Sequence, residues 1–124
     1  MNDRTDGLLS WQWRLYPDNH CDRRNLLVHA LTVPLFQSGT VLLATSPFTS
    51  PWMVLPGALA VVSALALQGR GHRLESEAPV PFRGPFDVVA RLFVEQWVTF
   101  PRFVLSGGFA RAWRATRNAG ASVA

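Results

Sequence analysis

Hydrophobic residues are concentrated in one long block in the middle of the chain. Positions 25–69 contain no Asp, Glu, Lys or Arg, and a turn-rich segment at 46–51 divides them into two halves. The halves predict helices over 23–45 and 52–68. At 1.5 Å per residue the first half rises about 31 Å, close to the hydrocarbon thickness of a bilayer. The pattern therefore predicts a hairpin of two membrane helices.

An amphipathic pattern follows the hydrophobic block and predicts a third helix over 86–105. Its apolar positions recur at helical spacing: Phe86, Val89, Phe93, Trp97 and Phe100. Asp87, Arg91 and Glu95 lie four residues apart on another face, so we expect them to pair along a solvated surface. Together these patterns predict an all-α fold, with a membrane helical hairpin, a connector, an amphipathic third helix and short terminal helices.

The composition favours a membrane protein over a soluble one. Only 16% of the residues are charged and 48% are hydrophobic, and the apolar excess falls in the single block. Every basic residue is Arg, and the formal net charge is +4. Because the Arg residues flank apolar segments and form no dense tract, we expect contact with membrane lipids and not with nucleic acid. We predict a single domain over 1–124, with disordered tails at 1–10 and 118–124.

The distribution of Arg predicts the orientation of the hairpin. The turn at 46–51 has no Arg, whereas several stand before the first helix and after the second. Under the positive-inside rule this pattern places both termini in the cytoplasm and the turn on the other side of the membrane.

All three histidines lie at the two edges of the uncharged block. His20 and His29 stand where it begins, and His72 stands where it ends. In a hairpin these edges return to the same end, so the histidines should converge there with Asn25 and Glu75. Three imidazoles and a carboxylate suit a first-row metal such as Fe(II) or Zn(II). His29 is the strongest indication, because an ionisable group inside an apolar helix is costly and more often functional.

Simpler interpretations of these residues stay open at the level of sequence. A single interfacial histidine commonly contacts headgroups or caps a helix, and Glu75 can pair with Arg70 or Arg73. Asn25 can be an ordinary residue of the first helical turn. No HExxH, paired CxxC or phosphate-binding loop accompanies the histidines.

Two sequence blocks resemble those of a family of small membrane proteins that includes the fungal 2-hydroxy fatty acid dioxygenases of fatty-acid α-oxidation. The blocks are His20-x4-Asn25-x3-His29-x4-Pro34 and Gln68-x2-Gly71-His72-x2-Glu75-x3-Pro79. The resemblance covers about residues 14–105. Two positions depart from it: Thr32 stands where the family has Gly, and Glu75 follows His72 by three residues instead of four. The chain therefore resembles a divergent bacterial branch, which implies a location in the bacterial inner membrane.

The resemblance implies an integral membrane enzyme that uses Fe(II) and O2 to shorten a 2-hydroxy fatty acid, or a related lipid-like acid, by one carbon. By position, the iron ligands would be three histidines with Glu75 as a fourth ligand or as an orienting group: His20, His29, His72 and Glu75. Asn25 would support these ligands through a hydrogen bond. Arg70 or Arg73 would bind the substrate carboxylate, because Arg offers a bidentate fork.

Other functional classes compete with the oxygenase. A non-catalytic structural membrane hairpin would carry histidines that bind no metal. A zinc-dependent lipid hydrolase would use the same ligands with a different metal. A homo-oligomer is also compatible with the pattern, as is a soluble helical bundle that buries the hairpin between protomers.

Overall fold

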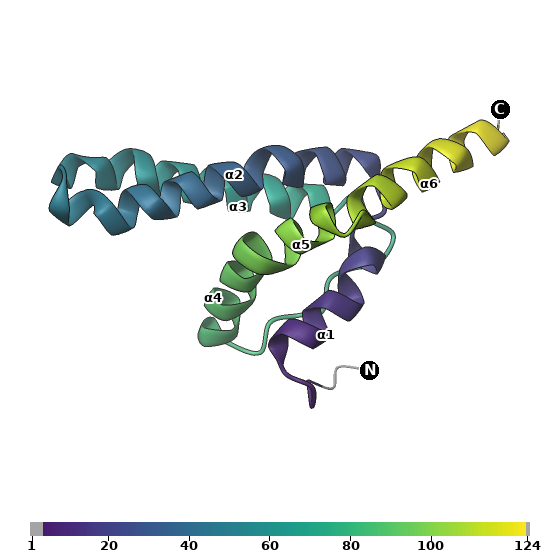
Figure 1. Cartoon of the computed structure of the whole chain (residues 1–124), viewed down its shortest axis with the longest axis horizontal. Helices are drawn as coiled ribbons and strands as arrows, with labels where there is room; N and C mark the ends of the chain where they lie inside the picture. Colours follow the sequence, from purple (N-terminus) through teal and green to yellow (C-terminus); the bar gives the residue numbers. More distant parts are fainter. Residues whose placement is uncertain (1–3, 124) are drawn as a thin grey trace.

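The computed structural model describes residues 4–123 as helices joined by short connections (Figure 1). The main helices are α1 Leu8–Leu15, α2 Arg23–Thr45, α3 Val54–His72, α4 Pro85–Val94, α5 Phe100–Leu105 and α6 Gly108–Val123. Short 3-10 turns lie at η1 Tyr16–Asn19, η2 Ser46–Phe48 and η3 Pro51–Met53, and η4 Glu95–Thr99 is a π-helical turn. No strand occurs within this part of the chain, so the all-α prediction is confirmed.

The hairpin is formed by α2 and α3, which lie side by side along their length (Figure 1). Asp22 begins α2 by accepting a hydrogen bond of 2.8 Å from the backbone N–H of Arg24. Small residues let the helices approach closely, since a Cβ on Gly39 would lie 2.8 Å from the carbonyl oxygen of Gly57. The sequence placed the first helix correctly. The second runs four residues further than predicted, and His72 is therefore its last residue.

The outer surface of the hairpin is apolar and largely uncovered. Both helical arms are long and apolar enough to cross a membrane, each with a mean hydropathy of 1.6. In Figure 1 the half of the hairpin nearest the turn projects away from the other helices. The exposed large side chains of the whole hairpin come from both arms and include Leu27, Leu31, Leu35, Val41, Leu55, Leu59, Val62 and Leu67.

The remaining helices gather at the open end of the hairpin. There a compact core forms where α1, η1 and α5 meet α2, and its buried members are Tyr16, Leu26, Val33, Phe100 and Phe103. Because the core lies at this end, it fixes the positions of the segments that carry the histidines.

The predicted third helix is present as the continuous run α4–η4–α5, from Pro85 to Leu105. Its middle is a π turn. Pro101 has no N–H to donate to the carbonyl four residues back, which favours a local change in the helical ladder. Such π turns are frequent at functional sites. Gly107, with φ +84°, then turns the chain into α6.

The pairing expected along this helix is present between Asp87 and Arg91, which lie 3.7 Å apart, but the expectation of a solvated face is wrong. Asp87 forms a bidentate ion pair with Arg4, and Arg91 is only 9% exposed because α4 packs against α1 on this face. Gln12 of α1 donates to the backbone carbonyl of Arg91 at 3.0 Å. Glu95 turns inward, toward the histidines.

The structure describes parts of both segments that the sequence predicted to be disordered tails. Arg4 binds Asp87, and α1 begins at Leu8, so the described part of the first segment is folded. At the other end, helix α6 extends to Val123. Residues 1–3 and 124 lie outside the described residues.

Candidate metal centre

Four side chains from four different segments meet at the open end of the hairpin. His20 follows η1, His29 lies in the second turn of α2, His72 ends α3, and Glu95 begins the π turn η4. One potential ligand atom from each lies within 4.8 Å of all the others. These residues can therefore hold one metal ion between them.

The distances between the potential ligand atoms fit tetrahedral coordination of one metal ion. Nε2 of His20 lies 3.4 Å from Nε2 of His29, and Oε1 of Glu95 lies 3.3 Å from Nε2 of His29 and 3.7 Å from Nε2 of His20. Two nitrogens bound tetrahedrally to a metal at about 2.1 Å stand about 3.4 Å apart. The His72 ring completes the group, with its centroid 4.9 Å from that of His20 and 5.0 Å from that of His29.

The backbone sets the tautomer of two of the histidines. Nδ1 of His20 is 2.9 Å from the carbonyl oxygen of Tyr16, and Nδ1 of His29 is 3.0 Å from that of Asn25. A carbonyl only accepts, so each Nδ1 carries the hydrogen and each neutral ring presents the lone pair of Nε2 to the cluster. The two Nε2 lone pairs and the carboxylate of Glu95 then face one another, and none of these three groups has a hydrogen to donate to the others. A metal cation satisfies all three.

Burial keeps His20 in the form that binds metal. The side chain is 2% exposed, and burial, together with the neighbouring His29, lowers the pKa of His20 to about 3. The imidazole is therefore neutral near pH 7. The ring of Tyr16 stacks on it at a centroid distance of 3.8 Å, which holds its orientation.

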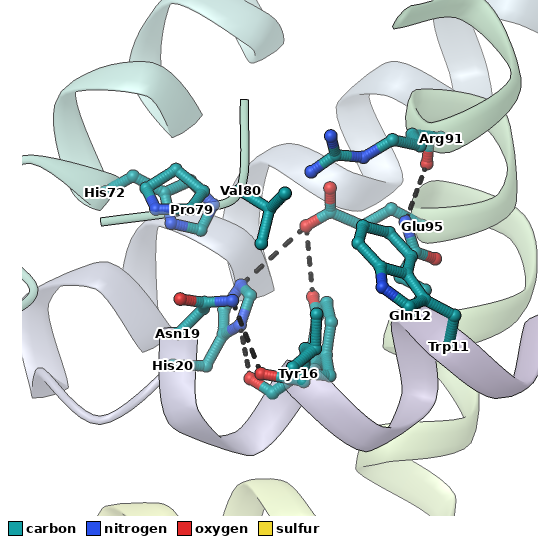
Figure 2. A pocket seen from close by; sticks show the side chains of 11 residues that line it. Trp11, Gln12, Tyr16, Asn19, His20, His72, Pro79, Val80, Arg91 and Glu95 are labelled. Atoms are coloured by element: carbon teal, nitrogen blue, oxygen red, sulfur yellow. Dashed lines mark hydrogen bonds and ion pairs between the residues drawn. The ribbon is translucent and has the colours of Figure 1, made fainter. Parts of the chain in front are cut away.

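Glu95 is an ionised acceptor in this site. Burial acts to raise the pKa of Glu95, but its interactions with His29, His20 and His72 outweigh burial and lower the pKa to about 2. The hydroxyl of Tyr16 donates to Oε1 of Glu95 at 3.2 Å. Burial raises the pKa of Tyr16 well above its usual value, so this phenol remains a donor and orients the carboxylate (Figure 2).

The structure brings the three predicted histidines together but gives Glu75 a different role. Its carboxylate accepts hydrogen bonds from the backbone N–H groups of Cys21 and Asp22, each at 3.0 Å, and lies outside the cluster. It also accepts from Nδ2 of Asn25 at 2.7 Å. A carboxylate at the start of α2 satisfies donors that a helix leaves free there. Glu75 thus ties the end of α3 to the segment that carries His20.

Asn25 connects this anchor to the cluster. Its backbone carbonyl accepts from His29, and its side chain donates to Glu75. Gly71 allows the contact, because a Cβ at that position would collide with Oδ1 of Asn25. The close contact with Asn25 therefore explains why a Gly stands directly before His72.

Sequence reasoning missed Glu95. Glu95 stands four residues after Arg91, which favoured the interpretation of an ion pair along the helix surface. No sequence motif connects Glu95 with any of the histidines. Only the way in which α4 and η4 cross the hairpin brings it to the cluster.

Two cavities adjoin the cluster. A small one of about 60 Å³ is bordered by Tyr16, His20, His72 and Glu95 (Figure 2). A larger one of about 390 Å³ lies between α3, α4 and the connector at 73–84, and His72, Glu95 and Arg91 also border it. The predicted carboxylate binders, Arg70 and Arg73, are exposed and border neither cavity.

The chain matches no protein-family model, no curated protein and no solved structure. The geometry of this site and the apolar hairpin that carries it are therefore the features that indicate a function.

Proposed function

We propose that the protein is a membrane-embedded, Fe(II)-dependent oxygenase that shortens a 2-hydroxy fatty acid, or a related lipid-like acid, by one carbon. The observation that carries the proposal is the convergence of three imidazoles and one carboxylate at the end of an apolar helical hairpin. Histidines combined with a single carboxylate, with coordination positions left open, are the ligand type of non-haem iron oxygenases.

The residues of the site would have different roles in this reaction. His20, His29, His72 and Glu95 would hold the iron, which when bound would supply the centre for oxygen activation. Tyr16 would orient Glu95 and His20 by its hydroxyl and its ring. The buried surroundings of His20 and His29 would exclude bulk water from the metal.

The reaction balances without a further co-reactant. A 2-hydroxy acid and O2 yield the acid shorter by one carbon, together with CO2 and water. The C1–C2 bond breaks, C2 is oxidised from an alcohol to a carboxylic acid, and C1 leaves as CO2. These changes release four electrons, which reduce O2 fully. A site that uses Fe(II) and O2 alone is therefore chemically sufficient.

The hairpin supports a lipid-like substrate and a membrane location. The cluster lies at the hairpin end that carries Arg23, Arg24, Arg70 and Arg73, so the positive-inside rule would place the site and both termini on the cytoplasmic side. In a bacterium this arrangement corresponds to the inner membrane. An acyl chain in the larger cavity would lie beside α3, close to the lipid-facing surface.

The experiment that tests the proposal begins with the metal. Protein purified anaerobically in detergent is analysed for metal content, and wild type is compared with His29→Ala and Glu95→Ala. We expect near-stoichiometric iron that both variants lose, and oxygen uptake that depends on a 2-hydroxy acid. If all samples lack metal after reconstitution with Fe(II), the proposal is wrong and a structural membrane hairpin is favoured.

A zinc-dependent lipid hydrolase is the second candidate, because three histidines are also a common ligand set of catalytic zinc. Metal identity and oxygen dependence separate the two. Zinc that is lost in both variants, with ester hydrolysis in the absence of oxygen, would replace the oxygenase by the hydrolase.

A further inference from the structure

Arg91 is a buried cation beside the metal cluster, and the carboxylate that pairs with it, that of Asp87, is shared with Arg4. Its side chain projects from α4, is almost fully buried, and borders both cavities together with His72 and Glu95 (Figure 2). The guanidinium lies over the rings of Phe82 at 4.4 Å and Trp11 at 5.0 Å. These aromatic faces hold it in place.

The hydrogen bonds of Arg91 are incomplete. Nη1 donates to the carbonyl oxygen of Pro81 at 3.2 Å, whereas Nε is buried and has no hydrogen-bond partner. The nearest carboxylate outside the cluster is that of Asp87, 3.7 Å from Nη1, and Asp87 is already bound by both terminal nitrogens of Arg4. A buried guanidinium without a bidentate carboxylate is costly, and this favours an anionic ligand at that position.

The cavity beside Arg91 has two chemically different ends. Arg91, Glu95 and His72 form the polar end, and the remaining wall is largely apolar, with Leu65, Leu92 and Val80 among its residues. Its volume of about 390 Å³ lies within the usual range for small-molecule sites. Such a cavity suits an amphipathic acid whose head lies at the cluster and whose chain points away from it.

The negative charge of Glu95 does not prevent an anion from binding beside Arg91. Three neutral imidazoles, one carboxylate and a divalent metal carry a net charge of about +1, which would add to that of Arg91. A metal-loaded cluster therefore attracts the same anion.

We infer that Arg91 binds the acidic head of an amphipathic substrate beside the histidine cluster, while the cavity between α3 and α4 receives the apolar chain. Arg91 thus takes the role that the sequence suggested for Arg70 or Arg73. The identity of the ligand as a 2-hydroxy acid rests on the proposed function, whereas the preference for an anion rests on the contacts of Arg91 itself.

A binding measurement on the metal-loaded protein tests the inference without turnover. Calorimetry under anaerobic conditions compares 2-hydroxyoctanoate with octane-1,2-diol, which has the same chain and no charge. We expect wild type to prefer the acid by about tenfold or more, as for a charged hydrogen-bonded pair. Equal affinity of wild type for the two compounds would overturn the inference, whatever the variants do.

Variants then assign the preference to Arg91. Arg91→Gln should lose about tenfold or more in affinity for 2-hydroxyoctanoate and none for the diol, and Arg91→Lys should lie between wild type and Arg91→Gln because Lys lacks the planar fork. Arg114→Gln, which removes an exposed charge on α6, is the matched control and should bind both compounds as wild type does. Loss of acid binding in Arg73→Gln, with normal binding in Arg91→Gln, would contradict the assignment.

The outcomes separate this inference from the proposed function. If acid binding depends on Arg91 but no oxygen is consumed, the anion site stands and the oxygenase reaction fails. If oxygen is consumed and Arg91→Gln binds 2-hydroxyoctanoate normally, the oxygenase stands and the role of Arg91 is wrong.

Discussion

Oε1 of Glu95 lies 3.3 Å from Nε2 of His29, although one residue begins a π turn beyond the connector and the other lies within the apolar helix α2. This contact joins the amphipathic helix to the hairpin at the point where three histidines meet. It also makes Glu95, and not Glu75, the carboxylate of the candidate metal centre.

Glu95→Gln should remove metal, whereas Glu75→Gln should mainly reduce stability. Loss of the Glu95 carboxylate would take one of the four potential ligands from the candidate metal centre. Glu75 holds backbone donors at the start of α2, and its replacement should cost about 1–3 kcal/mol of unfolding free energy through weakened charged hydrogen bonds. Metal content and thermal unfolding of both variants, measured in the same detergent, check this. A Glu75→Gln protein that folds normally but lacks metal would contradict the assignment of Glu95.

Gly71→Ala should destabilise the hairpin by about 1–3 kcal/mol, because its methyl group collides with Oδ1 of Asn25 and α3 must move away from α2. Gly69→Ala is a matched control in the same helix, since nothing lies within 4 Å of a Cβ there. That control should be neutral or more stable by up to about 1 kcal/mol, as Ala favours helix more than Gly does. Denaturation midpoints of the two variants decide the matter, and equal destabilisation would refute the steric explanation.

Gln68 and Gln96 form a buried reciprocal amide pair between α3 and the π turn, with hydrogen bonds of 3.0 and 2.7 Å. Gln96→Leu or Gln68→Leu alone should cost about 1–3 kcal/mol, because each leaves the partner amide unsatisfied. The double variant should be less destabilised than the sum of the two. A double-mutant cycle on unfolding free energies measures this coupling, and strict additivity would show that the pair contributes nothing as a unit.

Asp87→Asn should lower stability at neutral pH by about 1 kcal/mol, because the ion pair with Arg4 ties the N-terminal segment to α4. The Arg4 guanidinium holds the pKa of Asp87 well below its usual range, even though partial burial opposes this. A carboxyl whose folded pKa is depressed contributes stability above its unfolded pKa, near 3.9, and loses it as the pH falls below that value. The difference in unfolding free energy between wild type and Asp87→Asn should therefore begin to shrink below about pH 4 and vanish only as the pH approaches the depressed folded pKa of Asp87. A difference that is constant from pH 7 to pH 3 would exclude the charge as the cause.

The order of hydrophobic and polar residues determined most of the fold. The uncharged block with a turn in its middle is enough for two long apolar helices, and its edges place His20, His29 and His72 at one end. The apolar repeat over 86–105 is enough for the third helix. These features depend on the periodicity and length of each segment, and both can be determined from the residues of that segment alone.

Tertiary structure alone decided the fourth member of the candidate metal centre and the buried cation. Glu95 and Arg91 have the spacing of a surface ladder, and only the packing of α4 on α1 and across the hairpin turns them inward. The carbonyls of Tyr16 and Asn25 that face the imidazoles are, in contrast, local contacts, each four residues before its histidine. Contacts between segments distant along the chain depend on how helices cross, and that geometry is set by the packing of the whole core and not by the pattern within any one helix.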